Sequence, residues 1–65
     1  MIRNVIKCPD GMVMVFDSRG EPIPEYQGPY EAVKGKILSD APVNTRFCYF
    51  PDYEKELEIV PREEW

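Results

Sequence analysis

Residues able to carry out acid–base or metal chemistry are scarce in this chain. Its 65 residues include no histidine, which removes the commonest general base and the commonest metal ligand. The aliphatic hydroxyls belong to Ser18, Ser39 and Thr45, and none of them has an activating partner beside it in the sequence. We therefore expect no hydroxyl nucleophile, and we expect the domain not to be an enzyme.

Cys8 and Cys48 are the two residues with nucleophilic or redox character. Neither belongs to a Cys-x-x-Cys motif, and two thiolates fall short of the four ligands of a structural zinc site. Lys7 precedes Cys8, although adjacent residues of a strand point to opposite faces. Two cysteines do not make a disulfide framework, so we expect free thiols. A Cys8–Cys48 disulfide and a thiol-dependent reaction at Cys8 are the alternatives.

The carboxylates are numerous but are not spaced as metal ligands. Glu54, Glu56 and Glu58 alternate as on the solvated face of a strand. The turns at residues 10–11 and 17–20 lack the ligand spacing of a calcium loop. The four glycines are scattered, so no phosphate-binding loop is present. The sequence predicts neither a metal nor a cofactor.

Residues 46–50, from Arg46 to Phe50, form the clearest candidate for a functional surface. An arginine followed by alternating aromatic residues, here Phe47 and Tyr49, is typical of strands that stack the bases of single-stranded nucleic acid. An isoelectric point near 4.6 opposes binding to a polyanion. This alternative function requires four basic residues to gather: Arg3, Lys34, Lys36 and Arg46.

Seven prolines separate the elements that must position these residues. Residues 2–7 and 12–16 have strand character and are joined by a Pro-Asp-Gly turn, which predicts a β-hairpin. Residues 21–27 contain two prolines and are expected to cross the surface in an extended form. A helix is predicted over 30–41, with one apolar stripe formed by Tyr30, Val33, Ile37 and Ala41.

Two further strands are predicted at 44–50 and 53–60. The order β-β-α-β-β predicts an α+β fold (ββαββ), with two hairpins forming a mainly antiparallel sheet and one helix on one face. Residues 1–65 are then one small domain. Residues 61–65 are too short for independent structure, and we expect them to form an acidic tail.

The second strand is apolar on both of its faces. Met12, Met14 and Phe16 point to one side, and Val13 and Val15 to the other. One helix covers one face, so the second face needs a cover: residues 21–27, Trp65 or another protein chain. We expect a small non-catalytic protein-interaction domain that forms a homodimer or docks on a larger protein. The expected contact residues are Met12, Met14, Arg46, Tyr49 and Trp65.

The acidity of the chain is confined to one part of it. Residues 1–51 carry six acidic and six basic residues, whereas residues 52–65 carry six acidic and two basic ones, which accounts for the net charge of −4. This distribution indicates a solvated edge strand with a charged tail, or an acidic face that docks on a basic partner. The sequence has no apolar run long enough for a membrane span and no signal-peptide core, which predicts a cytoplasmic protein.

Overall fold

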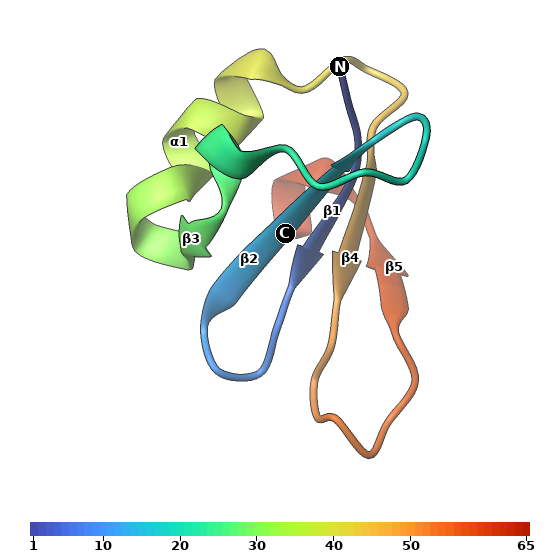
Figure 1. The fold of residues 1–65 in the computed structure, drawn as a ribbon. Helices are drawn as coiled ribbons and strands as arrows, with labels where there is room; N and C mark the ends of the chain where they lie inside the picture. Colours follow the sequence, from blue (N-terminus) through green and yellow to red (C-terminus); the bar gives the residue numbers. More distant parts are fainter.

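A five-stranded sheet forms the frame of the protein, as shown by the computed structural model, which describes residues 1–65 (Figure 1). The strands lie in the order β3-β2-β1-β4-β5. Their bounds are Ile2–Lys7 for β1, Met12–Asp17 for β2, Gly28–Pro29 for β3, Arg46–Tyr49 for β4 and Glu58–Val60 for β5. One α-helix, α1 (Tyr30–Asp40), connects β3 to β4. The predicted α+β class is confirmed.

The sheet is built from two hairpins that meet at a parallel pairing. β1 pairs antiparallel with β2, and β4 pairs antiparallel with β5. Between the hairpins, β1 and β4 run parallel, with Val5 opposite Phe47. A parallel pair needs a crossover connection, and α1 supplies it by carrying the chain back to the start of β4. The short β3 is an addition that the sequence did not predict.

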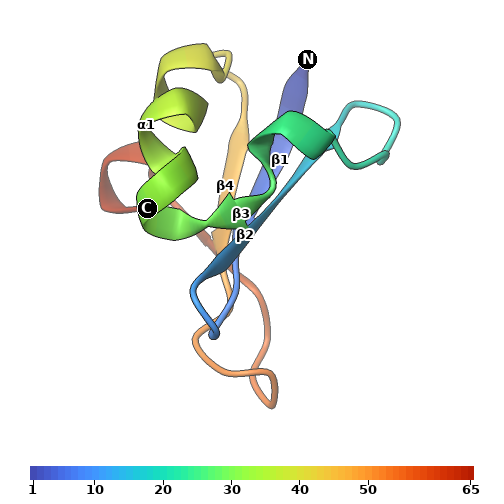
Figure 2. The same ribbon diagram turned by 60° about the vertical axis from the view of Figure 1, so that its left-hand side comes forward.

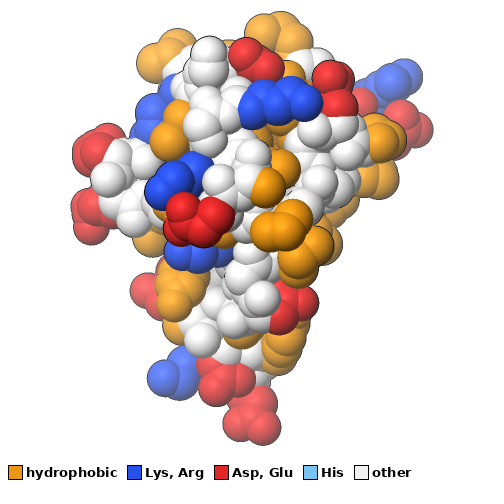
Figure 3. All heavy atoms as spheres, turned by 90° about the vertical axis from the view of Figure 1, so that its left-hand side faces the viewer, with side chains coloured by type: hydrophobic (Ala, Val, Ile, Leu, Met, Phe, Trp, Pro, Cys, Tyr) orange, Lys and Arg blue, Asp and Glu red, His pale blue; other side chains and the backbone are white.

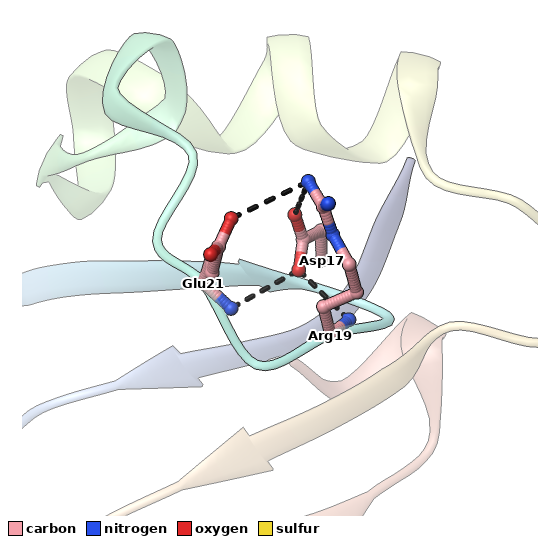
Figure 4. Close-up of polar contacts among 3 residues, drawn as sticks. All are labelled: Asp17, Arg19 and Glu21. Carbon is pink, nitrogen blue, oxygen red and sulfur yellow. Dashed lines mark hydrogen bonds and ion pairs between the residues drawn. The ribbon is translucent and has the colours of Figure 1, made fainter.

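The turn of the first hairpin forms as its residues predict. The Asp10 carboxylate accepts a hydrogen bond from the backbone N–H of Met12 at 2.9 Å, and Gly11 adopts a φ of +88°. At the other end of β2, the Asp17 carboxylate accepts backbone bonds from Arg19 at 2.8 Å and Glu21 at 3.0 Å (Figure 4). These backbone donors and the nearby Arg19 guanidinium lower the pKa of Asp17. The acidic groups of both turns thus stabilise the backbone.

The core lies between α1 and one face of the sheet. The predicted helix stripe is present, since Val33 and Ile37 are buried and Tyr30 packs against the core. The helix ends at Asp40, which agrees with a predicted end at or just before Ala41, because Pro42 disfavours helical backbone at Ala41. The buried cluster contains nine residues: Ile2, Val5, Val13, Val15, Val33, Ile37, Ala41, Phe47 and Trp65.

Residues 21–27 close the outer edge of β2. They contain a 3₁₀ turn at Pro24–Tyr26, which differs from the predicted extended crossing. The Gln27 side-chain amide accepts a bond from the Val15 N–H at 3.2 Å and donates to the Val15 carbonyl at 2.8 Å. The Ile23 N–H also donates to the Val15 carbonyl, at 2.9 Å. This segment therefore satisfies the polar groups that an edge strand would otherwise expose.

The C-terminal residues are packed into the domain, which corrects the expectation of an acidic tail at 61–65. After a 3₁₀ turn at Arg62–Glu64, the Trp65 side chain is only 7% exposed. Its ring centroid lies 5.1 Å from those of Tyr30 and Phe47, and its Nε1–H donates to the Cys48 carbonyl at 3.0 Å. The Arg62 guanidinium donates to the carbonyls of Leu38, Ala41 and Pro42, where α1 ends.

The predicted strand over 53–60 is shorter than its alternating pattern indicated. Only Glu58–Val60 pairs with β4. Asp52 starts a turn instead, with its carboxylate accepting the Glu54 N–H at 3.0 Å and its carbonyl accepting the Lys55 N–H at 3.0 Å. Alternation alone does not supply a neighbouring strand, and β4 ends at Tyr49. Residues 50–57 therefore form a loop beyond the end of the sheet (Figure 1).

We expect Trp65→Ala to lower the free energy of unfolding by about 3–5 kcal/mol, because it removes a buried indole that contacts both α1 and β4. Chemical denaturation followed by circular dichroism measures this change. Val43→Ala is the control, since Val43 is 98% exposed, and its effect is expected to stay below about 0.5 kcal/mol. A Trp65→Ala protein as stable as the control would contradict the packing described above.

Candidate interaction surface

Four apolar side chains lie in register across the face of the sheet that α1 does not cover. Ile6 on β1 is opposite Met14 on β2 and opposite Cys48 on β4, and Cys48 is opposite Ile59 on β5. Directly opposed residues point to the same side of a sheet. We call these four residues the apolar row: Met14, Ile6, Cys48 and Ile59.

The apolar row lies on the open face, by which we mean the side of the sheet away from α1. Val5, Val13 and Phe47 alternate with the row along their strands and belong to the buried cluster beneath α1. Figure 2 shows α1 and the C-terminal turn together on one side of the sheet, with no helix on the other side. The open face therefore has no helix over it, although Cys48 within the apolar row is only 2% exposed.

Residues 21–27 and Trp65 are the parts of the chain that we expected to cover the open face, and neither of them lies over it. Trp65 belongs to the buried cluster under α1, and Ile23 and Tyr26 from residues 21–27 pack against that same cluster. Met14 remains 36% exposed, Met12 42% and Ile59 67%. The open face thus keeps large apolar side chains in contact with solvent.

The loop of residues 50–57 covers one end of the open face. The Tyr53 ring centroid is 6.2 Å from that of Phe50, and the side chain of Tyr53 is near enough to Cys8 to influence its pKa. Cys48 is opposite Ile6, and Cys8 follows Ile6 by two residues, so both cysteines belong to the open side of the sheet. Both are nevertheless buried, and both are free.

Burial makes the two thiols poor nucleophiles. Desolvation raises the pKa of Cys8, the Asp10 carboxylate raises it further, and the Tyr53 hydroxyl opposes the increase. Desolvation also raises the pKa of Cys48, and the Arg46 guanidinium opposes that change. A catalytic cysteine needs the opposite environment, one that lowers its pKa. Thiol chemistry at Cys8 therefore has no support in the structure.

The residues expected to contact a partner do not all lie together. Met12, Met14 and Arg46 share the open face, since Arg46 precedes Cys48 by two residues on β4. Tyr49 lies on the other side, in register with Lys7 and Glu58, and Trp65 is in the core. The sequence pattern therefore grouped two residues with a surface to which they do not belong, and the expected set of contact residues omitted Ile6 and Ile59.

The proposed nucleic-acid platform is divided between the two sides of the sheet. Phe47 is buried against Trp65, and Tyr49 shares its side, whereas Arg46 lies on the open face. Lys34 and Lys36 are carried by α1, on the covered side. Figure 3 shows the side that carries α1, where acidic and basic side chains are interspersed. A continuous basic surface beside stacked aromatic rings is not formed.

Charge is distributed unequally along the open face. Arg46 stands at the end where β4 begins, close enough to Cys48 to influence its titration. At the other end, the β1–β2 turn contributes Asp10 and the loop of residues 50–57 contributes acidic side chains around a single lysine. The acidic residues of this loop are Asp52, Glu54 and Glu56.

Other parts of the molecule do not form a recognisable chemical centre. No three His, Cys, Asp or Glu side chains are placed to hold a metal ion together. A pocket of about 120 Å³ lies between Lys7, Tyr49, Val60, Glu64 and Trp65. The Lys7 ammonium lies 3.9 Å from the Tyr30 ring centroid, so its charge is engaged in a cation–π contact. Helix α1 has eleven residues, and no helix meets the length and apolarity that crossing a bilayer requires.

We expect alkylation of Cys8 and Cys48 by iodoacetamide at pH 8 to be at least about tenfold slower in the folded protein than in denaturant, because reagent access requires local opening. The raised pKa values act in the same direction, since they reduce the thiolate fraction at that pH. Mass spectrometry over time measures the rates at both sites. Equal rates in the folded and denatured protein would contradict the burial of the thiols.

Comparison with known proteins does not add a functional assignment. No protein-family model, curated protein or solved structure matches the chain. Function is therefore inferred from the surface of this chain alone.

Proposed function

We propose that this protein is a small non-catalytic protein-interaction domain and that the open face is its contact surface. The observation that supports this proposal is the open face, where the apolar row extends over four strands and Met12, Met14 and Ile59 stay 42%, 36% and 67% exposed. The largest exposed apolar patch of a small protein is often the place where another protein binds.

The side chains around the apolar row are suited to packing against another surface. Met12 and Met14 are unbranched and polarisable, so they adapt to the shape of a partner. Phe16 continues the same face of β2 beyond Met14 and is half-buried. Sheets that pack face to face interdigitate side chains of this kind at a separation of about 10 Å. The open face has the composition of one half of such a sandwich.

The two free thiols support a cytoplasmic location, because reducing compartments keep cysteines unpaired. Single-stranded nucleic-acid binding is the less supported alternative. The aromatic residues that it requires, Phe47 and Tyr49, are on the covered side of the sheet.

A photo-activated cross-linking amino acid tests the contact surface inside cells. Placed at Met14, it is expected to give a discrete protein adduct, because Met14 lies in the apolar row. Leu38 on α1 is the matched control, since its exposure of 38% equals that of Met14 within a few per cent. Gel mobility shifts followed by mass spectrometry identify the adducts.

A second variant separates a real interface from chance collisions. With the cross-linker at Met12, the added substitution Met14→Glu is expected to abolish the adduct, because it places an unpaired charge within the interface. The proposal is wrong if Met14 gives no adduct, or if Leu38 gives the same adducts in equal yield.

A further inference from the structure

The open face carries charge of opposite sign at its two ends, with the apolar row between them. Arg46 lies two residues from Cys48 on one side of the row, and Phe50 lies two residues from it on the other, where the acidic loop of residues 50–57 begins. From this arrangement we propose that the open face packs against the open face of a second copy of the chain, with the strands of the two copies running in opposite directions. The proposal rests on the proposed function and names the partner.

A two-fold axis parallel to the apolar row generates this dimer. A rotation about such an axis places the row of one copy over the same row of the other, so that Met14, Ile6 and Ile59 face their own counterparts around the buried Cys48. It also exchanges the two ends of each strand. Arg46 of one copy then faces Phe50 of the other, and the interface is the same patch on both subunits.

Charge selects this axis over the other two-fold axis in the plane of the interface. An axis parallel to the strands would keep the ends of the strands together, so that the acidic end of one copy lies over the acidic end of the other. Each chain has a net charge of −4, so two copies already repel each other. The axis along the row separates the acidic loops and places an Arg46 guanidinium near each of them, with the Phe50 ring as a further cation–π partner.

The small area of the open face indicates a weak association. Four strands spaced by about 4.8 Å, with about five residues rising about 3.3 Å each, give a flat area of about 300 Å². A stable interface buries about 800 Å² on each partner. An interface this small belongs to the weak, transient class, so we expect a dimer that dissociates readily on dilution.

Exchanging the charges of the two ends tests the proposal. In Arg46→Glu, a carboxylate faces the acidic loop of the other copy. In the double variant Glu54→Lys and Glu56→Lys, lysines face Arg46. Neither variant removes a hydrogen bond of the fold, whereas Asp52 and Asp10 hold turns and are left unchanged. Each variant alone is expected to dimerise at least about tenfold more weakly than the wild type.

An equimolar mixture of the two variants gives the decisive measurement. In a mixed dimer, the carboxylate introduced by Arg46→Glu in one copy meets the introduced lysines of the other. The native Arg46 of that other copy meets native glutamates, so both contacts are attractive. Sedimentation equilibrium of the wild type, of each variant and of the mixture is expected to show association restored in the mixture to within about threefold of the wild type.

A charge-matched control separates the proposed contacts from a general effect of net charge. The double variant Glu63→Lys and Glu64→Lys changes the net charge by the same amount as the double variant in the loop, but it does so on the covered side. It is expected to dimerise at least as well as the wild type.

The proposal is overturned if the wild type keeps the 7.6 kDa mass of one chain at several hundred micromolar. It is also overturned if mixing the variants fails to restore association, or if the Glu63 and Glu64 control loses it. Each of these results concerns the dimer and not the proposed function. If the cross-linker at Met14 forms an adduct with a different protein, the open face is a contact surface whose partner is not a second copy. The absence of any Met14 adduct would instead overturn the proposed function itself.

Discussion

The contact between Trp65 and the two layers of the domain is the interaction on which the rest of the structure depends. Its indole touches Tyr30 at the start of α1 and Phe47 in β4, while its N–H satisfies the Cys48 carbonyl. The Tyr30 hydroxyl in turn donates to the Trp65 carbonyl at 2.9 Å. A chain of this size buries a smaller share of its surface than a larger domain does, so one large aromatic residue shared by helix and sheet is an important part of its core.

The same arrangement determines which surface remains free. The C-terminal turn packs beside α1, and Arg62 supplies the positive group that the last turn of the helix itself lacks. The strand edge at β2 is closed by Gln27 and residues 21–27. At the other edge, β5 has three residues and is preceded by a strongly charged loop, which discourages strand pairing with another chain. These closures leave the open face, rather than an edge of the sheet, as the surface for the association that we propose.

The sequence predicts local structure well and long-range packing poorly. The hairpin at residues 2–17 and the helix that starts after Pro29 depend on turn chemistry and on periodicity, which are readable within a short window. The role of Trp65 depends on a contact with Tyr30, 35 residues away, which no local pattern encodes. The alternation over residues 53–60 is real, but a strand also needs a partner, and the partner ends at Tyr49. Met12 and Met14 indicated the candidate surface from the sequence alone. The place of Ile6 beside Cys48 on that surface could not be predicted, because it depends on the pairing of β1 with β4.

The parallel pairing of β1 with β4 has a consequence for how the chain is made. β1 is synthesised before the other strands, yet it lies at the centre of the sheet and has a neighbour that begins at Arg46. During translation, the β1–β2 hairpin is therefore synthesised before its neighbours. The edge of β1 that pairs with β4 stays unpaired, and Val5 and Val15 stay uncovered, until α1 and β4 have been synthesised. The pairing of β1 with β4 has a long sequence separation, and contacts of this kind slow folding because a long loop must close before they form.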